Sequence, residues 1–416
     1  MSKLKHFIAR FGPGFITGAA DDDPSGIATY TQTGAKFGYG LLWTSLFMLP
    51  MMSAIQEAVG RIGMVTGQGL TAVIRKRLPK WVLYVFVGLI VTANTINIGA
   101  DLGAMSDAAR LLVPNIPFTA MALIFTIVIL ALEIFVSYKA YAKILKWFSF
   151  ALLSYAVTVI MVTQDWGALA QGLILPHFEF NGTFLMMIVA LLGTTISPYL
   201  FVWQSNEEVE EEIAAGRTTV AQRRGATKAE MKDMRQDTFA GMFFSQAIMF
   251  CIVATAASTF FKHGLFDIQS SAQAAQALEP LAGRFASLVF AVGVIGVGLM
   301  AVPVLSASAS YAMSEAFGWK EGLYKKFREA HGFYGVITIS TLIGLLINYI
   351  GINPIQALIY AAVINGLATP PLIAIILKVA NDKHIMGKWR NGWLSNSLCY
   401  FTLAATLVCA ILMFVI

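Results

Sequence analysis

The stretch AADDDPSGIATY, residues 19–30, places three consecutive aspartates, a proline and a glycine inside an otherwise apolar segment. Proline removes a backbone donor and clashes with the preceding helical turn, so a helix is expected to stop or kink here. A charged carboxylate at mid-bilayer costs roughly 2.5 to 3.5 kcal/mol, so an aspartate there usually faces a cavity, a partner or an ion. The stretch therefore predicts a broken membrane helix with a polar site at the break.

The composition of the whole chain indicates an all-α polytopic membrane protein. Of its 416 residues, 57% are hydrophobic and only 12% are charged, which is outside the usual balance of soluble domains. A spanning helix needs about 20 predominantly apolar residues. Eleven such runs are expected, at 13–36, 41–66, 82–106, 117–137, 143–163, 183–205, 238–261, 285–314, 333–351, 355–379 and 394–416.

The formal charge of +6 is explained by the distribution of basic residues between the two sides of the membrane, so a nucleic-acid partner is not needed to account for it. The basic residues gather in the segments that would lie on one side of the bilayer, together with the N-terminus. The positive-inside rule then predicts a cytoplasmic N-terminus and an outside C-terminus in the plasma membrane. The three cysteines, Cys251, Cys399 and Cys409, are isolated within apolar runs, so neither a disulfide framework nor a thiolate metal cage is expected.

A second discontinuity lies in the sixth run, at GTTISPYLFVWQ, residues 193–204, where Pro198 follows several small or hydroxylated residues. The two interrupted runs are the first of two successive sets of five. Broken helices at matching positions in two halves indicate an inverted-repeat transporter with its site near the midplane. We expect one transport domain, 1–416, with repeats at about 10–165 and 180–380 and an added helix at about 394–416.

Residues 205–237 form the longest polar stretch, acidic at first and basic later. This charge pattern is typical of a solvated cytoplasmic extension of the flanking helices.

The first break offers ligands for a hard cation. Pro24 and Gly26 would free backbone carbonyls beside Asp23, and carbonyl and carboxylate oxygens suit such an ion. Asp23 is the expected direct ligand. Asp21 and Asp22 either coordinate the ion together with Asp23 or lie in a water-filled vestibule, where they only change the electrostatic potential.

Residues 12–43, GPGFITGAADDDPSGIATYTQTGAKFGYGLLW, resemble the first span of the natural resistance-associated macrophage protein (Nramp) metal-ion transporters. The pattern of that family is GPGF, then Asp-Pro-Gly-Asn, then Gln-x-Gly-Ala-x-Phe-Gly-Tyr. Residues 370–389, PPLIAIILKVANDKHIMGKW, resemble its tenth span. The resemblance implies a LeuT-like fold and transport of divalent cations across the lipid bilayer. We also expect that no cofactor is needed and that the functional unit is a monomer.

Two departures from the family pattern bear on the substrate. Asp-Pro-Gly-Asn reads here as Asp23, Pro24, Ser25, Gly26, and the methionine before the span-six proline reads as Ser197. A thioether favours softer transition metals, whereas an all-oxygen site favours harder ions, and Mg²⁺ keeps several waters when bound. The pattern resembles the Nramp-related magnesium transporter branch, with Mn²⁺ possible as a second substrate. The expected metal residues are Asp23, Gly26, Thr194, Ser197, Asp22 and Asp21.

Most of the family's proton relay is missing from the chain. The histidine after the span-six proline is Tyr199, a later one is Gln204, and the Asp-x-x-Glu pair of span three is Asp101 and Ala104. Obligatory proton coupling is therefore not expected. The four residues expected along the pathway or behind the ligands are Tyr199, Gln204, Asp101 and Asn365.

Three alternatives remain open from the sequence. The first is a proton-coupled Mn²⁺ or Fe²⁺ importer of the same fold. The second is an ion-coupled symporter for an organic solute, although three aspartates would repel an anionic one. An intramembrane enzyme is the third, and it is disfavoured because the chain has neither a His-Glu-x-x-His nor a Gly-x-Ser-x-Gly motif.

Overall fold

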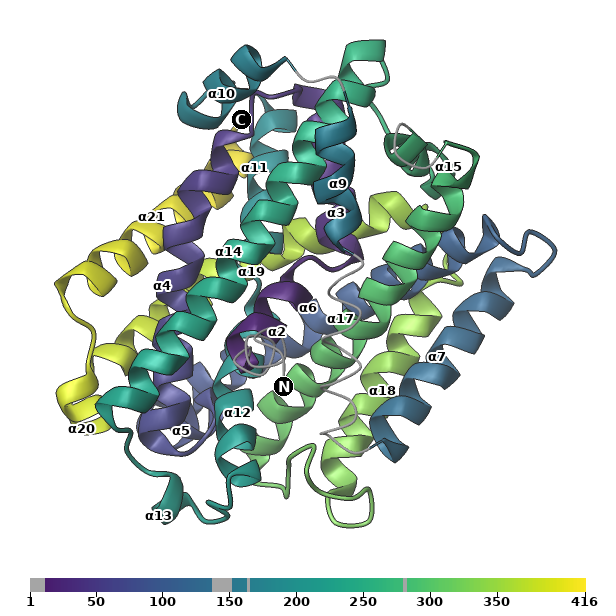
Figure 1. Cartoon of the computed structure of the whole chain (residues 1–416). Coiled ribbons are helices and arrows are strands. Elements are labelled where there is room, and N and C mark those ends of the chain that lie inside the picture. Colours follow the sequence, from purple (N-terminus) through teal and green to yellow (C-terminus); the bar gives the residue numbers. More distant parts are fainter. Residues whose placement is uncertain (1–11, 137–151, 163–164, 280–282) are drawn as a thin grey trace, which may run out of the picture.

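The structure is a computed structural model that describes residues 12–136, 152–162, 165–279 and 283–416. Every regular element in these ranges is a helix (Figure 1). The first half of the chain forms α2 (Pro13–Asp21), α3 (Pro24–Phe37), α4 (Trp43–Thr66), α5 (Leu70–Arg77), α6 (Lys80–Arg110), α7 (Phe118–Phe135), α9 (Leu153–Met161) and α10 (Trp166–Ile174). Residues 143–151 and 163 of the run expected at 143–163 lie outside the described residues.

The second half repeats the same order of long helices. Its elements are α11 (Gly182–Thr195), α12 (Pro198–Ala214), α13 (Val220–Arg223), α14 (Lys228–Thr259), α15 (Ser271–Ala275), α17 (Ala286–Phe317), α18 (His331–Ile347), α19 (Pro354–Asn381), α20 (Lys383–Met386) and α21 (Trp393–Val415). Within the described ranges, seven helical segments are long and apolar enough to cross a membrane, namely α6, α7, α11 with α12, α14, α17, α19 and α21.

Both predicted breaks are present. α2 ends at Asp21 and α3 begins at Pro24, and α11 ends at Thr195 and α12 begins at Pro198. Each second half-helix starts with proline, whose missing N–H and fixed φ suit the first helical position. Figure 1 shows the first break near the middle of the bundle, between α14 and α17.

The first half-helix of each break, α2 or α11, packs closely against another helix. A Cβ on Gly18 of α2 would lie 2.1 Å from the Gly241 carbonyl oxygen of α14, and one on Gly193 of α11 would lie 2.0 Å from the Ala362 carbonyl oxygen of α19. Only glycine permits such contact between backbones in a membrane bundle. The Asp237 carboxylate of α14 also caps the start of α2, accepting hydrogen bonds from the Gly12 and Gly14 amides at 2.8 and 2.7 Å.

The expectation of a solvated segment at 205–237 is wrong for its acidic start. α12 continues to Ala214, and its glutamates at 207, 208, 210 and 212 are all buried. The reason is packing, because this part of α12 lies against α4, α5 and α17 instead of projecting into water. Buried carboxylates at this end of the bundle were not expected from the charge pattern.

Candidate metal site at the two helix breaks

Asp23 is the centre of the polar contacts at the first break. It precedes α3 as its N-cap, and its Oδ1 accepts a hydrogen bond from the Gly26 amide at 2.7 Å. Its Oδ2 accepts one from Asn97 of α6 at 2.8 Å, and the Tyr199 hydroxyl of α12 lies 3.5 Å from the same oxygen. Asp23 is only 2% exposed, so the site is closed in this conformation.

Asp21 and Asp22 share one hydrogen-bond donor from another helix. The Ser245 hydroxyl of α14 lies 2.8 Å from Asp21 Oδ2 and 3.3 Å from Asp22 Oδ1. Both carboxylates are fully buried, and their other oxygens have no hydrogen-bond partner among the described residues. The two aspartates therefore keep acceptor oxygens without a protein donor.

The three carboxylates have no basic partner among the residues that the structure describes. In the described part of the chain, none of them forms an ion pair with lysine, arginine or histidine. Nor do any three His, Cys, Asp or Glu side chains in that part converge closely enough to hold a metal ion by themselves. A cation bound here would need backbone oxygens and water besides carboxylate, as Mg²⁺ commonly does.

The polar atoms of the second break mostly contact their own backbone. The Ser197 hydroxyl lies 3.0 Å from the Gly193 carbonyl oxygen and 2.6 Å from that of Thr194. Thr369 of α19 donates to the Ile196 carbonyl oxygen at 3.1 Å. In this conformation the carbonyl oxygens of Gly193, Thr194 and Ile196 accept side-chain hydrogen bonds, and an ion bound through them would have to replace those bonds.

The fold brings the two breaks into contact. The Tyr199 hydroxyl donates to the Ala20 carbonyl oxygen at 2.7 Å. A Cβ on Gly26 would lie 3.2 Å from Thr194 Oγ1 and 3.4 Å from the Tyr30 ring. Thr194 and Tyr30 therefore fill the space beside Gly26, and a side chain at position 26 would have to displace them.

The four expected pathway residues lie in different places. Tyr199 contacts the first break directly. Asp101 is buried on α6 one turn after Asn97, and neither of its oxygens has a hydrogen-bond partner among the described residues. Asn365 of α19 is buried with its Oδ1 equally without a described donor. Gln204 is five residues past Tyr199, about 7.5 Å along the helix, and it donates to Glu208 instead of facing the break.

Sequence reasoning missed two residues that contact the aspartates. The first is Asn97, whose amide donates to Asp23. Ser245 was not considered at all, although SQ at 245–246 is a polar pair within an apolar run. Such a pair is a signal that the helix faces a polar interior at that level.

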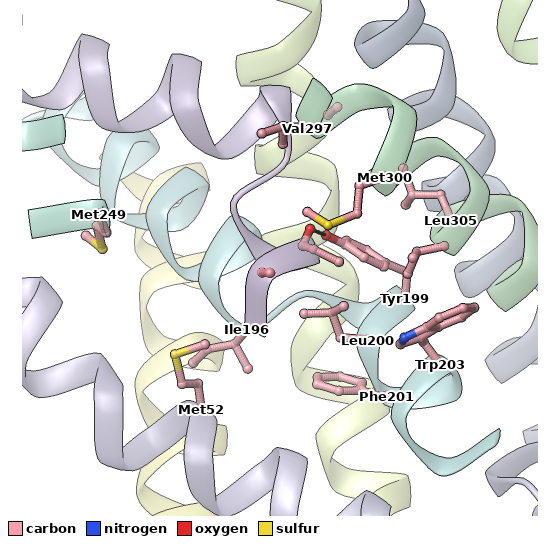
Figure 2. Packing of buried hydrophobic residues seen from close by; sticks show 14 of the residues in the cluster. Met52, Ile196, Tyr199, Leu200, Phe201, Trp203, Met249, Val297, Met300 and Leu305 are labelled. Atoms are coloured by element: carbon pink, nitrogen blue, oxygen red, sulfur yellow. Dashed lines mark hydrogen bonds between the residues drawn. The ribbon is translucent and has the colours of Figure 1, made fainter. Parts of the chain in front are cut away.

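Apolar side chains surround the start of α12 and seal the site from solvent. Figure 2 shows Ile196, Tyr199 and Leu200 packed with Met52 of α4 and Met300 of α17, and all five belong to the buried core. In such water-poor surroundings a charge interacts more strongly with its partners than it does in water. Among the described residues, the site therefore combines carboxyl groups that have no ion-pair partner with exclusion of bulk water.

Known proteins share this sequence pattern and this arrangement of helices. The profile described as natural resistance-associated macrophage protein-like (Nramp) matches residues 14–416. The divalent metal cation transporter MntH of Bacillus subtilis (strain 168) is 27% identical over 398 residues, which cover 92% of this chain and 87% of that protein. Its counterpart in Pectobacterium carotovorum subsp. carotovorum (strain PC1) is 25% identical over 390 residues, covering 92% and 89%.

Solved structures confirm the LeuT-like fold. A manganese transporter of Eremococcus coleocola, solved with a bis-isothiourea compound, superposes with a TM-score of 0.79 at 17% identity, covering all of this chain and 87% of that one. Mhp1, a nucleobase-cation-symport-1 family transporter, gives 0.63 at 13% identity, covering 97% and 90%. These relatives are all transporters, in agreement with the expectation that the chain is not an enzyme. The profile match over nearly its whole length shows that the chain belongs to the Nramp family.

Proposed function

We propose that the chain carries divalent metal cations across the plasma membrane by alternating access, binding the ion where the two breaks meet. The observation that carries this proposal is the buried Asp21–Asp23 cluster, which has no described protein counter-charge. Asp23 is the direct ligand. The other proposed contributors are oxygen atoms of Gly26, Thr194 and Ser197, with Asp21 and Asp22 adding negative charge.

We propose Mg²⁺ as the preferred substrate. Ser197 replaces the family's thioether, so the proposed ligand residues at the two breaks offer only oxygen atoms, and oxygen ligands suit Mg²⁺. Since Mg²⁺ dehydrates reluctantly, it would enter with part of its water shell. The contacts of Gly26 with Thr194 and Tyr30 would then have to loosen when the hydrated ion binds.

Uptake is proposed to run without obligatory proton coupling. Tyr199 takes the position of the family's histidine, and its hydroxyl is held by the Ala20 carbonyl oxygen. An inside-negative potential of 100 mV favours entry of a divalent cation by about 4.6 kcal/mol, twice the value per unit charge. That driving force is enough to sustain uptake by itself.

The proposed orientation places the N-terminus in the cytoplasm and the C-terminus outside. The end of the bundle that carries α5 and α13 would then be cytoplasmic, and it is rich in basic residues, including Arg75, Lys76 and Arg77. Positive charge in short loops is retained on the cytoplasmic side. We further propose that one chain is the functional unit, since both breaks come from the same polypeptide.

Ion flux into proteoliposomes tests the proposal. Purified protein is reconstituted, and uptake of Mg²⁺, Mn²⁺ and Ca²⁺ is followed together with a pH-sensitive dye, for the unchanged chain and for Asp23→Ala. Flux of at least one divalent cation that the variant loses is expected, with Mg²⁺ carried fastest and no stoichiometric proton movement. Equal flux in the variant would refute the site.

A proton-coupled manganese importer is the second candidate, and the names of the similar proteins favour it. The solved relative from Eremococcus coleocola is a manganese transporter. The same flux experiment separates the two candidates. Mn²⁺ uptake accompanied by proton entry and unaffected by excess Mg²⁺ would favour this second function over the first.

A further inference from the structure

A second group of buried carboxylates lies at the other end of α12, away from the breaks. Glu210 is twelve residues past Pro198, about 18 Å along the helix. It lines a cavity of about 150 Å³ together with Asn206 of α12, Tyr311 of α17 and Glu321 of the loop that follows α17. Besides these residues, the cavity is lined by the start of α5, the second half of α12 and α13.

Glu210 has one carboxylate oxygen with protein partners and one without. Its Oε1 accepts hydrogen bonds from the Tyr311 hydroxyl at 2.5 Å and from the Leu323 amide at 2.9 Å. Its Oε2 has no hydrogen-bond partner among the described residues, although Glu210 is only 3% exposed. A buried carboxylate oxygen without a partner is costly unless a ligand or ion occupies the space beside it.

The loop after α17 bends back toward α12, so that Glu321 lines the same cavity. Gly318 has φ of +73° and Gly322 has φ of +117°, and the second value lies in a region that only glycine adopts readily. The bend between them lets the Leu323 amide reach Glu210 and places Glu321 on the cavity wall. Glu321 Oε2 also lacks a described hydrogen-bond partner.

The basic side chain in the cavity wall makes its hydrogen bonds to backbone carbonyl oxygens. Arg223 lines the cavity, but its guanidinium donates to the carbonyl oxygens of Gly67, Arg217 and Thr218. In the described ranges, neither Glu210 nor Glu321 forms an ion pair with a lysine, arginine or histidine. Two acidic side chains thus line one small cavity, and among the described residues neither has a basic partner at ion-pair distance, although Arg223 lies in the same wall.

We propose that Glu210 and Glu321 bind a second divalent cation, separate from the ion at the helix breaks. Two carboxylates completed by water are a common coordination of Mg²⁺, and Mn²⁺ accepts the same oxygen ligands. A cavity of about 150 Å³ has room for an ion and several waters, since one water occupies about 30 Å³ in the liquid. A cation here links α12, which contains the second half of a broken helix, to the loop after α17.

Mn²⁺ binding to the full-length purified protein tests this second site. Free Mn²⁺ is measured by electron paramagnetic resonance during a titration, which gives the number of ions bound per chain. The unchanged protein is expected to bind two ions, and Glu210→Gln is expected to bind one. The glutamine oxygen can still accept from Tyr311 and Leu323, so the local fold is kept. A stoichiometry that Glu210→Gln leaves unchanged would overturn the proposal.

Further variants separate this site from the proposed transport site. Glu321→Gln changes the loop and leaves α12 unaltered, and it is expected to lose the same single ion. That loss could not be explained by misfolding of α12. Glu211→Gln, on the exposed face of the same helix, should still bind two ions. Asp23→Asn should lose the other ion. If the unchanged protein binds only one ion, and Asp23→Asn removes it, the second site is refuted while the transport site stands.

Discussion

The two helix breaks have similar backbones and different chemistry. At the first break, Asp23 caps α3 and accepts hydrogen bonds from its own chain and from Asn97 of α6. At the second break, the equivalent N-cap is Ser197, whose hydroxyl makes no capping bond to α12 and donates back to the carbonyls of α11. One break holds the charge, and the other supplies neutral oxygen.

This difference suggests that the two breaks contribute differently to cation binding. The carboxylates of the first break are held by donors from α6, α12 and α14, so their positions depend on the whole bundle. The second break is satisfied largely by itself, with one added donor from α19. We therefore expect changes at the first break to alter affinity for any cation, and changes at the second to alter which cation is preferred.

The largest effect on transport is expected from Asp23→Asn. Asparagine caps a helix as well as aspartate does, so the fold should persist while the negative charge is lost. Divalent-cation uptake should fall at least about 100-fold, equivalent to about 2.8 kcal/mol of binding free energy. The measurement is initial uptake rate into proteoliposomes at several ion concentrations.

A matched control for that variant is Asp233→Asn, which removes an exposed carboxylate from α14. Its uptake should equal that of the unchanged protein. Comparable losses in both variants would mean that the general surface charge matters and the break does not.

A large effect on stability is expected from Gly193→Ala. The new Cβ would lie 2.0 Å from the Ala362 carbonyl oxygen and 2.3 Å from the Gly366 amide nitrogen, and neither backbone atom can move without separating α11 from α19. Overpacking typically costs 1–3 kcal/mol, and we expect about 3 kcal/mol here. Thermal unfolding in detergent would measure it.

Gly293→Ala on α17 is the control, because nothing lies within 4 Å of the position that its new methyl group would take. It should leave the unfolding temperature unchanged or slightly higher, since alanine favours helix over glycine by about 1 kcal/mol. Equal unfolding temperatures for both variants would show that the second break tolerates separation of its helices.

A change of preference is expected from Ser197→Met. The thioether would add a soft ligand at the second break, so the ratio of Mn²⁺ to Mg²⁺ uptake should rise, by about tenfold if the sulfur contributes about 1.4 kcal/mol. Competition of the two ions in one uptake assay measures the ratio. Ser197→Ala is the comparison variant, and it should leave the ratio close to that of the unchanged protein. A rise in both variants would trace the preference to loss of the hydroxyl and not to the sulfur.

The broken helices could be predicted because Pro24 and Pro198 act on their own local backbone. The acidic cluster at Asp21–Asp23 could also be predicted, because the three residues are consecutive in the sequence. The donors to those carboxylates could not be found in this way, because Ser245 lies more than 200 residues away in the chain. The buried Glu210 was also misplaced, since only the packing of α5 and α17 against α12 decides that this acidic segment leaves water.

The smallest effect is expected from Ser245→Ala, and it tests whether the first break depends on other helices at all. Ser245 is the described donor to both Asp21 and Asp22. Loss of one hydrogen bond costs about 1 kcal/mol net, so KM for the transported cation should rise about fivefold. Ser245→Thr retains the hydroxyl and should restore most of the affinity. An unchanged KM in Ser245→Ala would mean that the backbone of the break alone positions the carboxylates, so that the two breaks would be held in the same way despite their different charge.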